Sequence, residues 1–245
     1  MPFLTELKIF ITNLLAWLGG WFVLALVFFV WPFNNSLAVQ TLSKIKIDLL
    51  PTNVQLIVTN PLSAFLTQMI IALLLAFIFT LPIFLYGLIR YLAPALVGRE
   101  RRALGQVLLP SFLLFLGGCL FAYLFLIPAT LKILYPYATD IGVTPFFALN
   151  EFVTLVFSLM IATGALFLLP VFMFLLSWAG LIRASFWRQH WRYAFLFFLI
   201  FSAIITPDGT GITMAMLCLP LMGLYLLGYV IIKMVERKRL KKINS

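Results

Sequence analysis

The charged residues of this chain are excluded from six apolar stretches. Asp, Glu, Lys and Arg are absent from residues 9–43, 49–89, 103–131, 152–182, 193–207 and 209–232. A charge at the centre of a bilayer costs about 2.5–3.5 kcal/mol on insertion scales, so a lipid environment selects this pattern. The pattern predicts an all-α membrane protein with six transmembrane helices, at about 9–31, 64–90, 104–131, 152–178, 191–206 and 212–233.

The amino-acid composition agrees with one polytopic membrane domain that covers residues 1–245. Hydrophobic residues make up 64% of the chain, charged residues only 10%, and the mean hydropathy is +1.14. Soluble domains carry about 25% charged residues. Because a spanning helix needs about 20 residues, six helices and their joints use the whole length. No room is left for a soluble catalytic domain.

The distribution of cations predicts the orientation. The net charge is +10, and alternation of the six helices places every Lys and Arg except Lys44, Lys46 and Lys132 on one side. The positive-inside rule makes that side cytoplasmic. Both termini and the basic tail 234–245 are therefore expected in the cytoplasm, as in a multi-pass protein of a plasma (inner) membrane. The same rule accounts for the basic charge, so no nucleic-acid partner is expected.

The predicted helices differ in length and straightness. Residues 193–206 span only about 21 Å, against a hydrocarbon core of about 30 Å. Helix 5 must therefore extend into the aromatic and basic stretch 186–192 or thin the bilayer. The tight turn containing Pro207 and Asp208 predicts that helices 5 and 6, both expected to be short, are antiparallel neighbours. Helices 2, 3, 4 and 6 contain prolines that bend helices and can build a concave bundle: Pro82, Pro110 or Pro128, Pro170 and Pro220.

The spans carry no side chains that would support catalysis or ion coupling. They contain no carboxylate, and Lys and Arg occur only at their ends, at Arg90, Arg192 and Lys233. The one histidine, His190, lies at a helix boundary among Trp and Arg residues. Cys119 and Cys218 lie inside apolar runs, where cysteine behaves as a small buried hydrophobe. Metal-ligand spacings and phosphate-binding glycine loops are also missing from the sequence. We therefore expect neither an enzyme nor a cofactor or metal site.

Motifs along the chain indicate a family. Residues 91–102 read Tyr-Leu-Ala-Pro-Ala-Leu-Val-Gly-Arg-Glu-Arg-Arg, which resembles the aromatic-x-x-Pro-(Gly/Ala)-Leu-x-x-x-Glu-Arg joint after helix 2 of the TatC family. That family is the multispanning receptor subunit of the twin-arginine protein translocase. Further similarities follow in order: 114–123 with Pro128, 164–167 with Pro170-Val171 and Gly180, Arg192-Tyr193, Thr206-Pro207-Asp208, and Pro220-Leu221 with Tyr225. The resemblance runs from about residue 3 to residue 229.

The chain also departs from the family pattern. The family's N-terminal His-Leu-x-Glu-Leu-Arg reads Phe-Leu-Thr-Glu-Leu-Lys at residues 3–8, which keeps the acid but loses the histidine. Glutamates that are common in the family's fourth and sixth spans correspond to Leu168 and Leu226. The usual Glu and Lys near the start of helix 2 correspond to Ser63 and Ile70. Steps that would depend on carboxylates inside the membrane therefore lack their side chains here.

The resemblance implies a receptor for signal peptides that carry two adjacent arginines, working with TatA-like and TatB-like single-span partners to move folded proteins. It further implies self-association in a larger complex and the proton gradient as energy source. Carboxylates near the cytoplasmic surface suit a guanidinium pair, because bidentate hydrogen bonds form there without deep burial. The signal-peptide site implied by the family comprises Glu6, Lys8, Glu100 and Arg101.

Polar and small side chains at membrane depth, the usual docking surfaces for partner helices, suggest partner contacts, and the prolines and the tight turn suggest structural positions. Partner contacts are expected at Thr163, Gly164, Leu168, Ser202 and Thr206, and structural or hairpin roles at Pro94, Pro170, Pro207 and Asp208. Simpler roles stay open for several of them. Glu100 lies beside Arg99, Arg101 and Arg102 and could form a surface ion pair. Glu6 could interact favourably with the positive end of the helix dipole, and small residues such as Gly164 could allow close packing between helices of this chain.

Two functions of other classes stay open. Six proline-bent spans could form a small-molecule or ion transporter, although the lack of charge within the spans argues against ion coupling. The missing carboxylates at Leu168 and Leu226 leave room for a membrane assembly scaffold that binds partner helices without supporting export.

Overall fold

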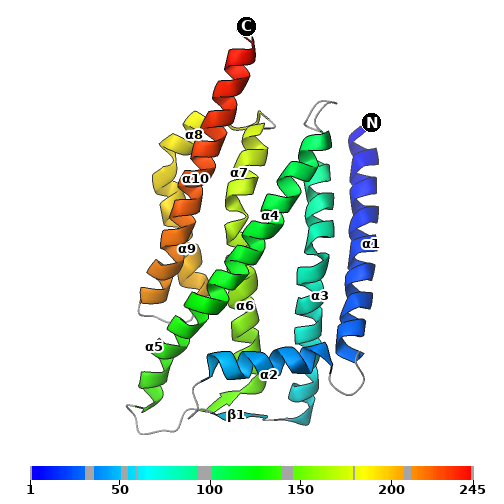
Figure 1. Cartoon of the computed structure of the whole chain (residues 1–245), viewed down its shortest axis with the longest axis vertical. Helices are drawn as coiled ribbons and strands as arrows, with labels where there is room; N and C mark the ends of the chain where they lie inside the picture. The colour runs from blue at the N-terminus through cyan, green and yellow to red at the C-terminus, as the bar shows by residue number, and fades with distance from the viewer. Residues whose placement is uncertain are drawn as a thin grey trace. The chain divides into compact units, whose positions relative to one another are not determined.

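The computed structural model describes residues 2–30, 36–50, 55–58, 60–92, 101–139, 146–178, 180–206 and 211–243. At the helix ends 2–10, 88–92, 101–106, 138–139 and 238–243 only the backbone is considered. The elements, shown in Figure 1, are α1 (Pro2–Val30), α2 (Leu37–Leu49), β1 (Gln55–Ile57), α3 (Pro61–Leu92), α4 (Arg101–Phe121), the π-helix η2 (Ala122–Leu126), α5 (Ile127–Thr139), β2 (Phe146–Ala148), α6 (Leu149–Phe167), α7 (Leu169–Trp178), α8 (Ala184–Gln189), α9 (Trp191–Ile205) and α10 (Ile212–Ile243).

The described part of the chain is mostly helical and rich in long apolar helices. Five stretches are long and apolar enough to cross a bilayer: 11–30, 61–87, 107–137, 149–178 and 212–237. A sixth apolar helix, α9, has 15 residues, about 22 Å, which confirms the prediction of a short fifth helix. α9 begins at Trp191, because α8 takes up most of the aromatic and basic stretch before it as a separate helix.

The prediction of a short sixth helix is wrong. α10 is 32 residues long and continues through most of the basic tail to Ile243. Lys, Arg and Glu are good helix formers, and the sequence after Gly228 contains neither glycine nor proline to end the helix. Cations in the last turns also interact favourably with the negative end of the helix dipole.

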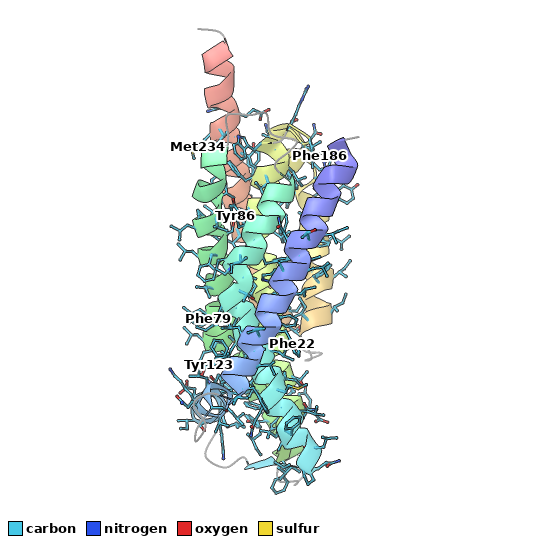
Figure 2. The ribbon with its side chains drawn as sticks, turned by 90° about the vertical axis from the view of Figure 1, so that its right-hand side faces the viewer. Phe22, Phe79, Tyr86, Tyr123, Phe186 and Met234 are labelled. Carbon is cyan, nitrogen blue, oxygen red and sulfur yellow. The ribbon has the colours of Figure 1, made fainter. Side chains whose placement is uncertain are left out.

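The chain forms two compact units, of which the first comprises residues 1–91 and 131–158. In this unit α1 runs antiparallel to α3 (Figure 1), and two tryptophans join them. The Trp17 Nε1–H donates to the carbonyl of Thr80 at 3.0 Å, and the Trp21 Nε1–H donates to that of Leu73 at 2.8 Å. Figure 2 shows the same two helices side by side, with Phe22 on α1 and Phe79 on α3. Indole donors thus find acceptors on a helix surface that is otherwise apolar.

Two features of this unit had no counterpart in the predicted spans. α2 lies crosswise to α1 and α3 (Figure 1) and is capped by Ser36, whose Oγ accepts from the Val39 N–H at 3.4 Å. The short strands β1 and β2 pair in parallel, with Leu56 opposite Phe147. These elements lie in the segments between long helices, where three-residue strands leave no hydrophobic periodicity to detect.

The second unit comprises residues 92–130 and 159–245. α4 and α6 cross closely, and a Cβ built on Gly118 would stand 2.8 Å from the Cα of Gly164. α10 packs on α7, where the Cα of Pro170 lies 3.3 Å from a Cβ built on Gly228. α10 also packs on α9, where the rings of Phe198 and Tyr225 meet edge to face at 6.0 Å. Glycine permits both close approaches because it has no side chain, and close packing of this kind holds transmembrane helices together.

Proline explains two interruptions in the long helices. Pro170 offers no N–H to the carbonyl of Leu166, and the chain turns between α6 and α7. There the N–H of Leu168 donates to Ala165 at 3.2 Å and that of Val171 donates to Leu168 at 3.0 Å. The π-helix η2 likewise comes just before Pro128. α3, α4 and α10 continue unbroken past Pro82, Pro110 and Pro220. The concave form of the bundle and its organisation as one domain stay predictions.

Candidate functional site

The predicted signal-peptide residues lie at helix starts or in a joint. Glu6 and Lys8 belong to the first turns of α1, and Arg101 is the first residue of α4. Glu100 and Pro94 fall in the joint 93–100, outside the described residues, as do Pro207 and Asp208. The geometry available for this site is therefore that of the helix backbones that lead into it.

The pairing of α1 with α3 sets the height of Glu6. Because Trp17 reaches Thr80 and Trp21 reaches Leu73, the start of α1 lies level with the end of α3. At 1.5 Å per residue, position 6 lies about 16 Å from Trp17 along α1, and Leu92 lies about 18 Å from Thr80 along α3. The α1 backbone at Glu6 is thus level with the last turn of α3, where the joint containing Glu100 begins (Figure 1).

The predicted partner contacts on α6 are buried within the second unit. Thr163 is fully buried, and a Cβ on Gly164 would stand 2.9 Å from both the Sγ of Cys119 and a ring carbon of Phe115. Leu168, in the turn after α6, is also buried. The Oγ1 of Thr163 is buried without a hydrogen-bond partner. Their contact with a partner helix stays a prediction, and it would require movement of the side chains that now cover them.

The two predicted contacts on α9 are buried as well. Ser202 is fully buried, and its Oγ has no hydrogen-bond partner. Its backbone carbonyl accepts from the Oγ1–H of Thr206 at 2.8 Å. Beyond Arg192, the side chains that α9 exposes are instead apolar and aromatic, and the most exposed of the large ones, Tyr193, Leu196, Ile200 and Ile204, follow a helical spacing. The predicted contacts are polar positions of this helix, whereas its exposed face is formed by other residues.

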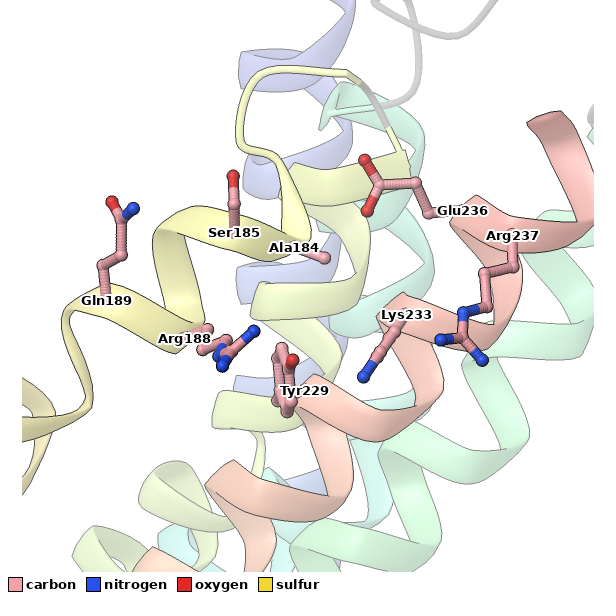
Figure 3. A pocket seen from close by; sticks show the side chains of 8 residues that line it. All are labelled: Ala184, Ser185, Arg188, Gln189, Tyr229, Lys233, Glu236 and Arg237. Atoms are coloured by element: carbon pink, nitrogen blue, oxygen red, sulfur yellow. The ribbon is translucent and has the colours of Figure 1, made fainter.

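A cavity that the sequence did not predict lies between α8 and the end of the apolar part of α10. It has a volume of about 540 Å³ and is shown in Figure 3. It is lined by Ala184, Ser185, Arg188, Gln189, Tyr229, Lys233, Glu236 and Arg237. The lining comes from segments about 40 residues apart, so only their common basic and aromatic composition signals it in the sequence.

The two cysteines are buried within the second unit, apart from any candidate metal ligands in the described residues. Cys119 and Cys218 are buried free thiols, which confirms that they act as small buried residues. Cys119 lies 3.4 Å from the carbonyl of Met160, at the crossing of α4 and α6. Within the part of the chain that the structure describes, no three His, Cys, Asp or Glu side chains gather as metal ligands.

A family model, related proteins and a solved structure that resemble this chain all carry the description TatC. Residues 3–220 match the model of the family described as Sec-independent protein translocase protein (TatC). The Sec-independent protein translocase protein TatC of Cenarchaeum symbiosum is 37% identical over 207 residues, which are 84% of this chain and 78% of that protein. The chloroplastic protein TATC of Pisum sativum is 35% identical over 156 residues, 64% of this chain and 44% of that protein. A crystal structure of the twin-arginine translocase receptor TatC has a TM-score of 0.77 and 28% identity, and covers 94% of this chain and 99% of its own.

Proposed function

This chain belongs to the TatC family of Sec-independent protein translocase proteins, and we propose that it is the receptor that binds twin-arginine signal peptides. It is a membrane component of protein translocation and not an enzyme. The observation that carries the proposal is the similarity over almost the whole chain to a solved receptor of this family. The signal peptide itself is inferred from the sequence motifs and from the chemistry of the acids.

The proposed site comprises Glu6, Lys8, Glu100 and Arg101 at the cytoplasmic face. Acids are scarce, with only seven in the chain, and Glu6 and Glu100 are two of the three on the predicted cytoplasmic side. The start of α1 lies level with the end of α3, from which the chain enters the joint that contains Glu100. Each carboxylate can accept two hydrogen bonds from a guanidinium, while the neighbouring cations can donate to peptide carbonyls.

The proposed topology has six spans, with both termini in the cytoplasm of a plasma (inner) membrane. The five long apolar stretches supply five spans, and α9 is the sixth. A helix of about 22 Å can serve as a span if the bilayer thins around it. The cation distribution supports the orientation, since Lys44, Lys46 and Lys132 are the only ones on the outer side.

The proposed partners are TatA-like and TatB-like single-span subunits, together with further copies of this chain, in a process driven by the proton gradient. Helices associate in lipid through close packing, and the exposed face of α9 offers apolar side chains for it. The proposed contact region still comprises Thr163, Gly164, Leu168, Ser202 and Thr206. The exposed face of α9 lies next to Ser202 and Thr206 along the chain.

Crosslinking tests the signal site. A photoreactive signal peptide with an Arg-Arg pair should label the wild-type protein in membranes, and a Lys-Lys peptide should label it weakly, because lysine cannot bind a carboxylate bidentately. The double variant Glu6→Gln, Glu100→Gln should lose most of the Arg-Arg labelling. Glu151→Gln is the matched control, since it removes an exposed acid from the first turn of α6. Undiminished labelling of the double variant would refute the assigned site.

The scaffold function keeps one observation in its favour. Leu168 is apolar and buried where the family commonly has a glutamate, so a polar partner contact is missing there. Complementation separates the two functions. A strain without its own receptor should export a folded Arg-Arg reporter when supplied with this chain, whereas a scaffold would bind partner helices and leave export unrestored.

A further inference from the structure

The cavity between α8 and α10 has a cationic rim. Arg188 on α8 and Lys233 and Arg237 on α10 contribute three positive charges, and Glu236 is the only carboxylate in the lining. The charge of the lining is therefore +2. Such a rim attracts an anion, and the forked Arg donors suit the oxygens of a phosphate.

The side chains are directed to one region of the cavity. In Figure 3 the heads of Arg188 and Lys233 extend toward Tyr229, while the carboxylate of Glu236 extends away from them. The Nζ of Lys233 lies 5.8 Å from the centre of the Tyr229 ring. An anion beside this ring would meet the cationic heads of Arg188 and Lys233, and the Tyr229 hydroxyl would be a further hydrogen-bond donor.

The helix that forms one wall is held firmly in place. The Trp187 Nε1–H of α8 donates to the Oγ of Ser177 at 2.9 Å, and the Tyr225 hydroxyl of α10 donates to the carbonyl of Trp187 at 2.6 Å. The ring of Phe186 stacks on that of His190 at 4.1 Å. Arg188 therefore projects from a helix that is tied to both α7 and α10.

The cavity lies at the boundary between the apolar and the charged parts of α10. Lys233 is the first charged residue after the run from 209 to 232. The preceding turns expose Leu226, Leu227, Val230 and Ile231 by 52%, 59%, 42% and 48%. Trp191, at the start of α9, is 46% exposed, as is usual for tryptophan at a membrane interface. A ligand here can place an anionic head in the cavity and apolar chains beside α10.

We propose that this cavity binds the phosphate headgroup of an anionic phospholipid, whose acyl chains lie along the exposed apolar side of α10. Basic pockets beside membrane helices recognise such headgroups. A free phosphate would use the same cations but would leave the adjoining apolar surface without a role. The lipid site is independent of the proposed signal-peptide site, with which it shares no residue.

Native mass spectrometry of the full chain in a neutral detergent tests the proposal. The apparent dissociation constant of the first bound lipid is measured for phosphatidylglycerol and for phosphatidylcholine, which carries no net charge. We expect phosphatidylglycerol to bind roughly tenfold more tightly. In the variant Arg188→Gln, Lys233→Gln, its affinity should fall by about tenfold, while that of phosphatidylcholine stays the same.

The matched control is Lys44→Gln, Lys46→Gln, which removes the same charge from exposed positions of α2 and should keep the wild-type affinity. Equal losses in both double variants, or equal binding of the two lipids to the wild type, would overturn the proposal. Displacement of phosphatidylglycerol by millimolar inorganic phosphate would assign the cavity to a soluble anion instead. If Arg188→Gln, Lys233→Gln fails to fold, the exposed Arg237→Gln alone should weaken phosphatidylglycerol about threefold, and an unchanged affinity there refutes the site.

Discussion

The crossing of α4 and α6 depends on Gly118 and not on its neighbour Gly117. A Cβ on Gly118 would lie 2.8 Å from the Cα of Gly164 and 2.9 Å from the carbonyl oxygen of Thr163, both of them backbone atoms. A Cβ on Gly117 would meet nothing within 4 Å. The variants Gly118→Ala and Gly117→Ala therefore differ only in the face of α4 that receives one methyl group.

The magnitude follows from the geometry. Carbon atoms pack at about 3.5–4.0 Å, so α4 and α6 must separate by roughly 0.7 Å or more to admit the new methyl group. Overpacking of this kind costs about 1–3 kcal/mol. Both variants gain the same helix propensity, up to about 1 kcal/mol, which cancels in their difference. With about 2–4 °C per kcal/mol for a chain of this size, Gly118→Ala should unfold roughly 2–12 °C below Gly117→Ala.

The two buried cysteines provide the assay. A dye that fluoresces on reaction with thiols reports unfolding, because Cys119 and Cys218 are buried free thiols in the folded protein. Cys119 lies at the crossing and Cys218 lies on α10, so single-cysteine backgrounds distinguish local opening from global unfolding. Gly164→Ala should fall between the other two variants, since its Cβ would meet side chains of Cys119 and Phe115. Equal midpoints for Gly117→Ala and Gly118→Ala would refute the crossing.

Three further predictions use the same thiol assay. Trp17→Phe and Trp21→Phe each remove a donor to α3 and should cost about 1 kcal/mol each; unchanged midpoints would show that the indole bonds contribute nothing. Ser202→Ala removes a buried hydroxyl without a partner, so the midpoint should stay or rise; a clear fall would reveal a bond to that hydroxyl. Leu168→Glu should lower the free energy of unfolding of the isolated protein by about 2 kcal/mol or more, and with it the midpoint, because it buries a carboxylate. The same variant should strengthen crosslinking to a TatA-like helix; unchanged crosslinking would discard the polar contact.

The long helices could be predicted because lipid imposes a coarse requirement on them. A run of about 20 uncharged apolar residues is visible in any sequence, and the interruption at Pro170 follows from a missing N–H. The length of α10 could not be obtained in this way. Beyond the membrane the helix is set by local propensity, and Lys and Arg favour helix as readily as they mark a cytoplasmic tail.

The finer contacts could not be predicted because they depend on which face a helix presents. Gly117 and Gly118 are adjacent in one motif, yet only the second meets α6. The polarity of Ser202 predicts a partner contact, whereas its side chain is buried and most exposed positions of α9 are apolar. In lipid both the buried and the exposed faces of a helix are apolar, so the pattern of polar and apolar residues does not show which face of the helix is buried. The cavity of Arg188 and Lys233 was missed for a related reason, since its two walls are distant in the sequence.

The two missing family glutamates have different physical consequences. Leu168 is buried at the break between α6 and α7, so a carboxylate there would need a partner to be stable. Leu226 is 52% exposed among the apolar residues of α10, where a carboxylate would face lipid at a cost of about 2.5–3.5 kcal/mol. Leucine at both positions removes these costs and, with them, two polar sites for a partner helix. Partner association in this chain should therefore depend on close packing against apolar faces such as that of α9, and less on hydrogen bonds within the membrane.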